Sequence, residues 1–592
     1  QRPPSQPSYP QQGQRPPSQP SYPQQGGYIA GPASQQAAPS YLPTAAPVGA
    51  NQPSYPPQGQ SYPPQGQSYP PQGQSYPPQG QSYPPQVRPA SKGKGLWIAL
   101  LLLVLVGLGV GGYFVFAGGP NVKAEIERGD QAFERKGGLA EAVTAYRTAV
   151  DQDANNFQAR QRLAVAYLMR GRPDAADPII RQAVNLKPND PEGHAWLSQV
   201  YSDQRKYNEA LAEAEEAVRL GQNSPLAYMA LATARADVGL EQKDEDLLNE
   251  ALADADRSIE IALGETSRLN QALAYNAKGY AQWQLYQFKT QRDNTTGDEL
   301  VDAGIDQFNR AIGLQDQLPV LQNNLGYFYA QQGYVADFKG DGSALDKFDK
   351  ANDAFDAAIS LDSEYGAAYA GKGWTAIYQK EYEASILLFD QALERNPQDP
   401  NALVGRGLAH WWLGTLGLGD AQQDFQTAVE NYEAALAEAP SYLSAYVDLG
   451  NIYLYSLADY PRAEDTYRRA LEQDPAYAEA FAGIGDVLYL QNFYAEAIEN
   501  YDQALALNPE IATAYLGRAN AQAAQGNYSD SLPNYNLALQ YNNTLREAYL
   551  GKASAEQQLG DSAGARETLE AGLASVSQED QSALQNALDE LP

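Results

Sequence analysis

The residue types that do chemistry are scarce in this sequence. Its 592 residues include no Cys and only two His, His194 and His410. A zinc site with Cys ligands, an iron–sulfur cluster and a Cys nucleophile are therefore excluded, and we expect no metal and no cofactor. His410 precedes Trp411 and Trp412. A helical His without a second His nearby is more often packed or exposed than catalytic.

Other catalytic and ligand-binding signatures are missing as well. The segment KGDGS at residues 339–343 does not have the GxxxxGK[ST] order of a phosphate-binding loop. The surrounding residues lack the alternating ligands and terminal Glu of a calcium loop, so KGDGS is predicted to be an inserted solvent loop. Pairs of carboxylates among 72 acidic residues are typical of a solvated face. The sequence therefore predicts that the protein is not an enzyme.

Charge is divided unevenly along the chain. Residues 1–95 contain five basic residues and no acidic ones, whereas the chain after residue 120 carries 36 basic and all 72 acidic residues. An acidic body of this kind repels phosphate, which disfavours nucleic acid as a partner. We expect basic or neutral protein partners.

The first zone, residues 1–95, has low complexity. It repeats QRPPSQPSYPQQG and then a seven-residue unit, QSYPPQG. Frequent Pro blocks helix formation and few aliphatic side chains are available for a core, so we expect a disordered tail with polyproline II character. Two roles stay open: a multivalent tyrosine-rich segment that self-associates or docks, and a plain spacer. The sequence starts within a repeat and without Met, and we expect further residues before Gln1.

The second zone, residues 96–117, contains 22 residues without a charge, enough to cross a bilayer as one helix. A cleaved signal peptide is the alternative, although its apolar region would be shorter. Gly107 and Gly111 have the GxxxG spacing that allows two membrane helices to pack. Arg88, Lys92 and Lys94 precede the span, so the positive-inside rule predicts a single-pass protein of the cytoplasmic membrane. The tail would be cytoplasmic, and the acidic body periplasmic or extracellular.

A periodic pattern fills the rest of the chain. Twelve times, a small residue follows a larger one by three positions, within helix-like apolar spacing. The small residues are 34 positions apart in regular units, with longer intervals of 41, 53, 47, 43 and 35. A second small residue lies 19 or 20 positions earlier in the uninterrupted units. Two helices approach closely only where neither carries a bulky side chain, so each unit is predicted to be a helix–turn–helix pair.

This pattern resembles the tetratricopeptide repeat family, most closely at residues 445–543, for example AYVDLGNIYLYSLADYPRAEDTYRRALEQDP. The resemblance is looser at residues 225–350, where insertions such as 289–302 interrupt units. It implies an all-α, right-handed superhelical solenoid of about twelve repeats over residues 121–576, followed by a capping helix at 577–592. It also implies an inner groove that binds proteins or peptides, and no reaction.

The resemblance further implies which residues face the groove. The residue after the small residue of each first helix points inward in this family, as does the residue four positions later. This rule selects Trp374, Tyr378, Trp412, Asn451, Tyr455, Asp486 and Asn520. Aromatic rings would supply contact area and Asn side chains would hold a peptide backbone. In the alternative interpretation the rings only pack between adjacent first helices.

Two functions follow from these features. The preferred one is a membrane-anchored scaffold that gathers partner proteins in the repeat groove. The alternative is a structural protein of the cell envelope, clustered through its Tyr/Pro/Gln tail.

Overall fold

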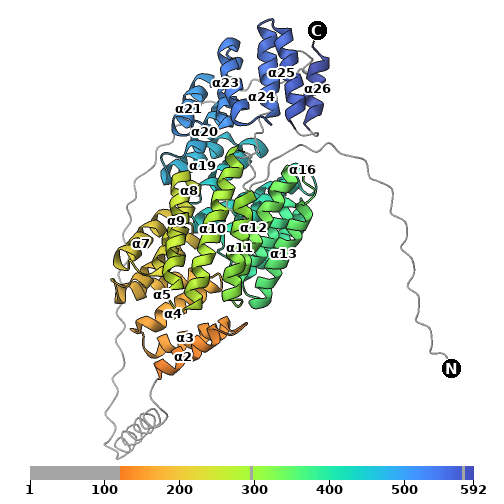
Figure 1. Cartoon of the computed structure of the whole chain (residues 1–592). Helices are drawn as coiled ribbons and strands as arrows, with labels where there is room; N and C mark the ends of the chain where they lie inside the picture. The colour runs from red at the N-terminus through yellow and green to blue at the C-terminus, as the bar shows by residue number, and fades with distance from the viewer. Residues whose placement is uncertain (1–120, 294–297, 577–579, 592) are drawn as a thin grey trace, which may run out of the picture. The chain divides into compact units, whose positions relative to one another are not determined.

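The computed structural model describes residues 121–293, 298–576 and 580–591. This part of the chain contains 25 α-helices, one π-helical turn and no strand (Figure 1). Residues from Val122 onward form one compact unit. The predicted tail (1–95) and the predicted membrane span (96–117) lie outside the described residues. Among the described helices, none combines the length and the apolar character that a bilayer crossing requires.

The helices follow one another as twelve helix–turn–helix pairs, and neighbouring pairs pack side by side. The first helices are α2 (Val122–Phe133), α4 (Phe157–Met169), α6 (Pro191–Asp203), α8 (Pro225–Glu241), α10 (Arg268–Asp293), α12 (Pro319–Phe338), α14 (Gly366–Tyr378), α16 (Pro400–Leu416), α18 (Leu443–Asn451), α20 (Ala478–Leu490), α22 (Ala512–Ala524) and α24 (Arg546–Gln558).

The second helices are α3 (Leu139–Gln152), α5 (Pro173–Leu186), α7 (Tyr207–Leu220), α9 (Glu245–Leu263), α11 (Asp298–Leu314), α13 (Ala344–Leu361), α15 (Tyr382–Arg395), α17 (Ala421–Glu438), α19 (Tyr460–Gln473), α21 (Tyr494–Leu507), α23 (Tyr528–Tyr541) and α25 (Ser562–Ser575). A last helix, α26 (Gln581–Asp589), packs against α25 and α24. The all-helical solenoid implied by the resemblance to tetratricopeptide repeats is confirmed.

Aromatic residues on second helices explain why the small residues recur. Tyr467 on α19 is fully buried. A Cβ atom added to Gly450 of the same repeat would lie 2.4 Å from the Tyr467 ring, and one added to Gly483 of the next repeat would lie 2.5 Å from it. The ring therefore fills the space between two successive first helices, where only glycine leaves room for it.

In the repeats with longer intervals, the additional residues lengthen helices as well as loops. The interval of 53 contains α10, which has 26 residues instead of the 13 or 14 of regular helices. The predicted insertion at 289–302 is thus largely helical, as the ends of α10 and α11. The single extra residue in the interval of 35 coincides with the π-helical turn Ile452–Ser456 after α18. A π-turn accommodates one additional residue without breaking the helix. KGDGS forms the predicted loop between α12 and α13.

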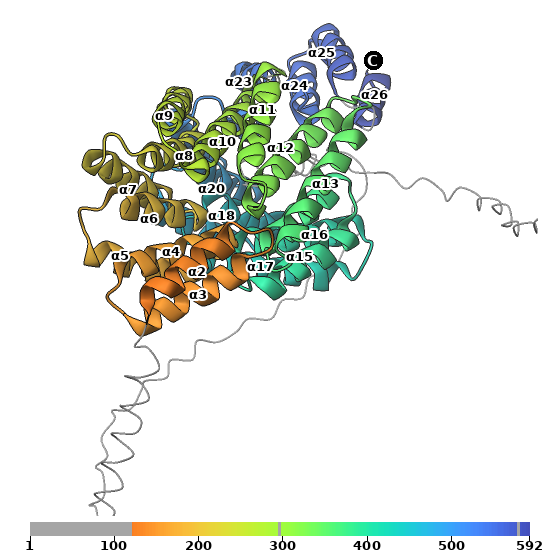
Figure 2. The ribbon, with the colours of Figure 1, turned by 60° about the horizontal axis from the view of Figure 1, so that its bottom comes forward.

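Early repeats also touch repeats that follow much later in the sequence. Figure 2 shows the helix pairs following one another from α2 to α26. Arg170 Nε donates to Asp362 Oδ2 at 2.6 Å, and Lys243 Nζ lies 2.5 Å from Glu479 Oε1. Between these contacts, Ser441 Oγ donates to the carbonyl oxygen of Arg205 at 2.7 Å. We call this line of contacts between the turns of early repeats and the loops of later repeats the seam.

Candidate binding cavity and the predicted groove residues

The aromatic residues predicted to line the groove are buried among helices. Trp374, Tyr378 and Trp412 are 0, 1 and 3% exposed. Trp374 packs edge-to-face on Phe389 with ring centres 5.7 Å apart, and Trp412 stacks on Tyr382 at 5.7 Å. Both partner rings lie on the second helix α15, so these contacts are between a first and a second helix. Contact of the three aromatic residues with a client stays a prediction.

The polar residues predicted to line the groove are half-buried and accept hydrogen bonds within the repeats. Asn451 Oδ1 accepts from the hydroxyl of Tyr467 at 2.8 Å, and Asn520 Oδ1 accepts from Tyr535 at 2.7 Å. Asp486 accepts from Tyr501 at 2.6 Å and from Tyr455 at 3.0 Å. Tyr146 and Asp130 form the same pair in the first repeat, at 2.7 Å. We call these pairs the Tyr–Asx ladder; binding of a client to Asn451, Tyr455, Asp486 and Asn520 stays a prediction.

Burial changes the acidity of Asp486 in this ladder and of Asp448, which lies outside it and accepts from Tyr432 of the preceding second helix. Burial raises the pKa of Asp486 to about 6, against the opposing effect of its two tyrosine hydrogen bonds. Burial raises the pKa of Asp448 to about 7, and the Tyr432 hydroxyl partly offsets this. Charged carboxylates are costly in such surroundings because they lose hydration.

Each His is paired with a carboxylate. His194 Nδ1 lies 2.6 Å from Glu213 Oε2, and His410 Nδ1 lies 3.0 Å from Asp424 Oδ1. Each pair joins the two helices of one repeat. Within the described ranges, no group of three or more His, Asp or Glu is arranged to hold a metal ion.

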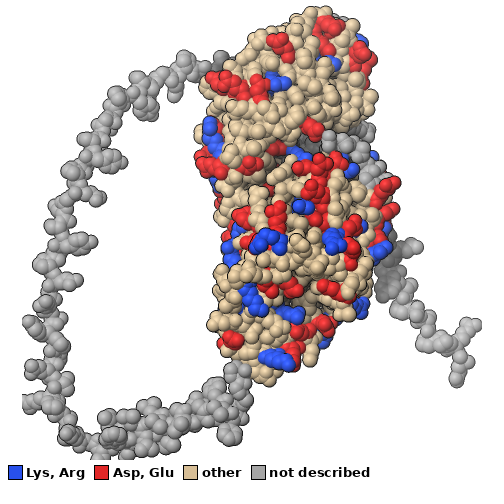
Figure 3. All heavy atoms as spheres, turned by 60° about the vertical axis from the view of Figure 1, so that its left-hand side comes forward, with Lys and Arg blue, Asp and Glu red and all other residues tan. Residues whose placement is uncertain are grey.

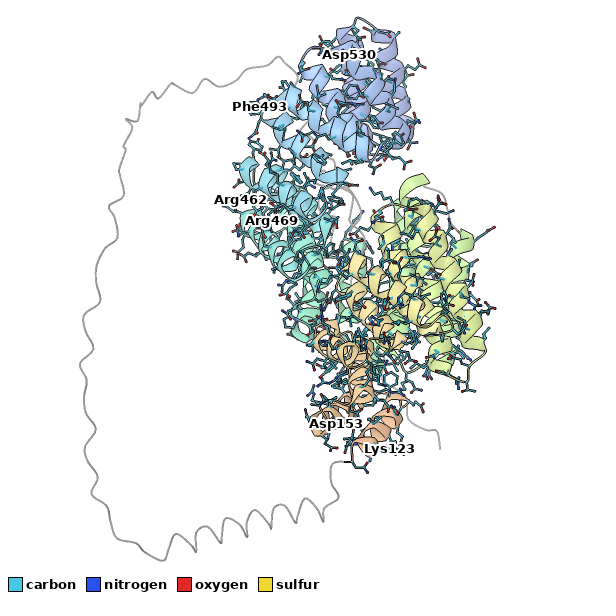
Figure 4. The ribbon with its side chains drawn as sticks, turned by 90° about the vertical axis from the view of Figure 1, so that its left-hand side faces the viewer. Lys123, Asp153, Arg462, Arg469, Phe493 and Asp530 are labelled. Carbon is cyan, nitrogen blue, oxygen red and sulfur yellow. The ribbon has the colours of Figure 1, made fainter. Side chains whose placement is uncertain are left out.

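Charged side chains on the outer surface are mostly interspersed with partners of opposite sign (Figure 3). Arg462 and Arg469 on α19 point away from the stacked helices in Figure 4. Arg462 Nε lies 2.6 Å from Asp459 Oδ2, and Arg469 Nη1 lies 3.0 Å from Glu433 Oε1. This face therefore offers few cations that are free of an acidic neighbour.

A cavity of about 510 Å³ lies where the early repeats meet the later ones. We call it the central cavity. Its walls come from the ends of α4, α6 and α8, from α10 and α12, and from the loops before α14 and α16. Its charged lining residues are mainly acidic: Asp174, Asp203, Asp237, Glu241, Asp399 and Glu438, against Arg205 and Lys206. A space of this volume is in the range of small-ligand and side-chain pockets.

Three of these acids have no basic partner: Asp203, Asp399 and Glu438, which accepts from the Gln398 side chain. Asp203 ends α6 and accepts a hydrogen bond from Gln199 Nε2 at 2.9 Å. Asp399 is the N-cap of α16 and accepts from the backbone N–H groups of Asn401 and Ala402 at 3.0 and 3.2 Å. None of the three carboxylates forms an ion pair with a Lys or Arg of the described chain. The pKa of Asp399 is raised by burial, and that of Asp203 is raised by burial to about 7, although Asp203 is open to the cavity.

Asp237 and Glu241 differ from Asp203 and Asp399 because a cation, Arg205, lies near them. Burial raises their pKa values to about 6 and about 7, and the nearby Arg205 guanidinium lowers both. Asp237 Oδ1 also accepts from Tyr280 at 2.5 Å and from Gln284 at 3.2 Å. Arg205 itself lies over the Tyr442 ring, 3.7 Å from its centre. This group of acids therefore has an internal cation, which Asp203 and Asp399 lack.

Aromatic and amide groups complete the walls of the cavity. Trp283 stacks on Tyr327 with ring centres 6.0 Å apart, and Tyr365 is 3% exposed. Asn323 and Asn396 are 5 and 7% exposed, and the Oδ1 atom of each has no hydrogen-bond partner. The sequence analysis missed this site. Its residues are up to 270 positions apart, and no local pattern marks Asp203 or Asp399 among the other acids.

Comparison with known proteins supports the repeat assignment. Profiles of the tetratricopeptide repeat match residues 136–200, 343–400, 370–417, 420–478 and 452–499, and a further TPR profile matches 485–526. Cellulose synthase operon protein C of Pseudomonas fluorescens is 30% identical over 173 residues, which are 28% of this chain. The matched residues span only 14% of that protein's length.

Several solved structures of repeat proteins are similar in outline. The yeast Tom70 structure has a TM-score of 0.40 and 15% identity, covering 79% of this chain and 95% of that one. A tetratricopeptide repeat protein of Parabacteroides merdae has a TM-score of 0.34 and 16% identity, covering 45 and 97%. The family profiles and the helix pairs together identify tetratricopeptide repeats in an all-helical solenoid, a fold that suggests a scaffold for protein–protein interaction.

Proposed function

We propose that this chain is a membrane-anchored scaffold that binds partner proteins or peptides within its tetratricopeptide solenoid. The observation that carries the proposal is the central cavity, in which acidic, amide and aromatic groups from several first helices and adjoining loops converge. Both His residues are engaged with carboxylates within single repeats and do not line the cavity. Binding rather than reaction is what this lining supports.

The membrane anchor in this proposal rests on the sequence. Residues 96–117 are uncharged and are preceded by Arg88, Lys92 and Lys94. The repeats would then be periplasmic or extracellular. Protease added to spheroplasts should degrade the repeats and spare the tail, and intact repeats beside a digested external control protein would reverse the orientation.

A second candidate is a cell-envelope assembly protein that clusters through its tail. The regular QSYPPQG units favour it, and Gly107 with Gly111 would add a contact between spans. Deleting residues 1–90 separates the two functions. A scaffold keeps its bound partners after this deletion, whereas an assembler loses its clustering in cells.

Affinity capture with the full-length chain tests the scaffold directly. We expect one or a few proteins to be retained in stoichiometric amounts, through residues after 120. A chain from which no protein is recovered, before or after chemical cross-linking in cells, would contradict the scaffold function.

A further inference from the structure

We propose that the central cavity, whose walls carry the carboxylates of Asp203 and Asp399, binds a lysine or arginine side chain of a protein partner. This inference rests on the scaffold function proposed above and adds the chemistry of the group that is recognised. Asp203 comes from an early repeat and Asp399 from a later one, so the bound side chain would lie where the two parts of the solenoid meet.

The charge of the cavity selects a cation. Asp203 and Asp399 have only neutral hydrogen-bond donors, namely one side-chain amide and two backbone N–H groups. Arg205 lies on the Tyr442 ring and lowers the pKa values of Asp237 and Glu241, but Asp203 has no such neighbour. Each of these two carboxylates can accept charge-assisted hydrogen bonds from a cation that enters the cavity.

The uncharged groups of the cavity favour an organic cation. Asn323 and Asn396 are more than nine-tenths buried, and their Oδ1 atoms accept no hydrogen bond. Ammonium and guanidinium groups are donors without acceptors, so they complement carboxylates and amide oxygens together. The aromatic residues Trp283 and Tyr365 also line the cavity, and aromatic rings in partly desolvated surroundings attract organic cations.

A protein partner suits the cavity better than a free amine does. Trp283 Nε1 is a buried donor without a partner, and a backbone carbonyl of a peptide would accept from it. The chain after residue 120 also carries twice as many acidic as basic residues, which attracts a basic partner over a longer range.

Proton binding links this site to pH. Burial raises the pKa of Asp203 to about 7, so this carboxyl group is partly protonated at neutral pH until a cation displaces the proton. The other ionisable groups around it are Asp237 on α8, Arg205 in the same turn, and Tyr365 and Asp399 on the opposite wall. The basic lining residues Arg205 and Lys206 oppose the cation, and neither loses its charge between pH 6 and 8. Affinity should therefore rise as the pH increases from about 6 to 8.

The test uses the full-length chain and blocked tripeptides, with binding followed by ligand-observed NMR titration. The peptides are acetylated and amidated Ala-Lys-Ala, Ala-Arg-Ala and, as the uncharged control, Ala-norleucine-Ala. We expect the Lys or Arg peptide to bind and the norleucine peptide not to bind. The variant Asp203→Asn/Asp399→Asn should weaken binding at least about tenfold. Asn also caps helices, so α16 should keep its N-terminus.

A matched control removes the same charge outside the cavity. Asp151→Asn/Asp353→Asn changes two exposed acids on α3 and α13 and should leave peptide affinity unchanged. Equal affinities for the Lys and norleucine peptides, equal affinities for both double variants, or no binding of either charged peptide would each overturn the proposal. Binding of putrescine without binding of any peptide would also overturn it, in favour of a free amine.

Capture of protein partners with the same two variants separates this inference from the scaffold function. A partner retained equally by wild type and by Asp203→Asn/Asp399→Asn leaves the scaffold standing and removes the cavity as its basic-residue site. Peptide binding at the cavity without any captured partner supports the cavity as a basic-residue site and contradicts the scaffold function.

Discussion

At the scale of single residues, the Tyr–Asx ladder shows how one position serves both the repeat and its groove. The residue after the small residue of a first helix lies opposite the second-helix tyrosine 15 or 16 positions later, which explains Asn451 with Tyr467 and Asp486 with Tyr501. Asn451 and Asp486 are selected because their positions point toward the groove. That rule does not predict their tyrosine partners, because the hydrogen bond depends on how the first and second helices cross. Burial of the tyrosine rings could be predicted from the 34-residue period, since a large residue always faces two small ones.

Substitution of the Asn and Asp acceptors of the Tyr–Asx ladder should lower the stability of the fold, whether or not these residues contact a partner. Asn451→Ala leaves the buried Tyr467 hydroxyl without an acceptor and should lower the free energy of unfolding by about 1–3 kcal/mol. Guanidinium denaturation followed by circular dichroism measures this. Asn500→Ala, which removes a half-buried amide that bonds only within α21, is the control. Equal losses in both variants would contradict a specific role for the ladder.

The raised pKa of Asp448 predicts how stability depends on pH. Its pKa is about 7 in the folded chain and about 4 when unfolded, so folding takes up a proton between these values. The stabilisation from this group is complete below about pH 4 and is lost as the pH rises through 7. Asp448→Asn should therefore make the fall in unfolding free energy between pH 5 and 8 shallower, on the order of 1–3 kcal/mol. The same slope in wild type and Asp448→Asn, with exposed Asp353→Asn as control, would refute this.

At the scale of elements, the ends of the solenoid and its irregular repeats differ in how far sequence predicts them. The C-terminal helix could be predicted from Leu584 and Leu588 on one face, and α26 does bury Leu584 completely. The lengths of the helices in the long repeats could not be predicted, because an inserted polar stretch suits a loop as well as a helix. The π-turn at Ile452–Ser456 shows the same limit, since an interval of 35 fixes one extra residue but not its conformation.

Removing the contact of α26 should weaken the end of the solenoid. Leu584 packs beside Gly572, where an added Cβ would lie 3.0 Å from Leu584 Cδ1, and Leu584→Ala should cost about 2–5 kcal/mol locally. Hydrogen exchange should rise in α25 and α26 and stay unchanged in α20 and α21. Leu588→Ala, at a less buried position of the same helix, is the matched control. Uniform exchange changes along the chain would contradict a local capping role.

At the scale of the whole solenoid, the seam brings together residues that are 192 and 236 positions apart in the sequence. Small rotations between successive repeats add up over a turn, so sequence periodicity alone does not fix which repeats meet. Arg205 illustrates the consequence. Its φ of 61° is uncommon for a residue other than glycine, and its carbonyl and guanidinium groups both contact the later repeats. The central cavity exists because of these contacts, which is why it could not be predicted from the sequence.

Removing a seam contact should separate the early repeats from the later ones and make the solenoid less compact. Arg170→Gln leaves the nearly buried Asp362 without its cation and should cost roughly 2–3 kcal/mol. Small-angle scattering should then report a larger radius of gyration. Arg468→Gln removes an exposed pair with Glu464 within α19 and should change neither quantity. An unchanged radius of gyration in Arg170→Gln would show that the closed arrangement does not depend on this contact.

The most direct test of the account is whether a partner occupies the central cavity in cells. The photoreactive residue p-benzoylphenylalanine can replace Gln398, an exposed residue of the cavity wall, or Asp353 on α13 outside it. Irradiation followed by mass spectrometry identifies the segment joined at each position. The account predicts that position 398, and not 353, is joined to a partner segment with a Lys or Arg close to the cross-link. Partner cross-links from position 353 alone, or segments at 398 without a basic residue, would contradict it.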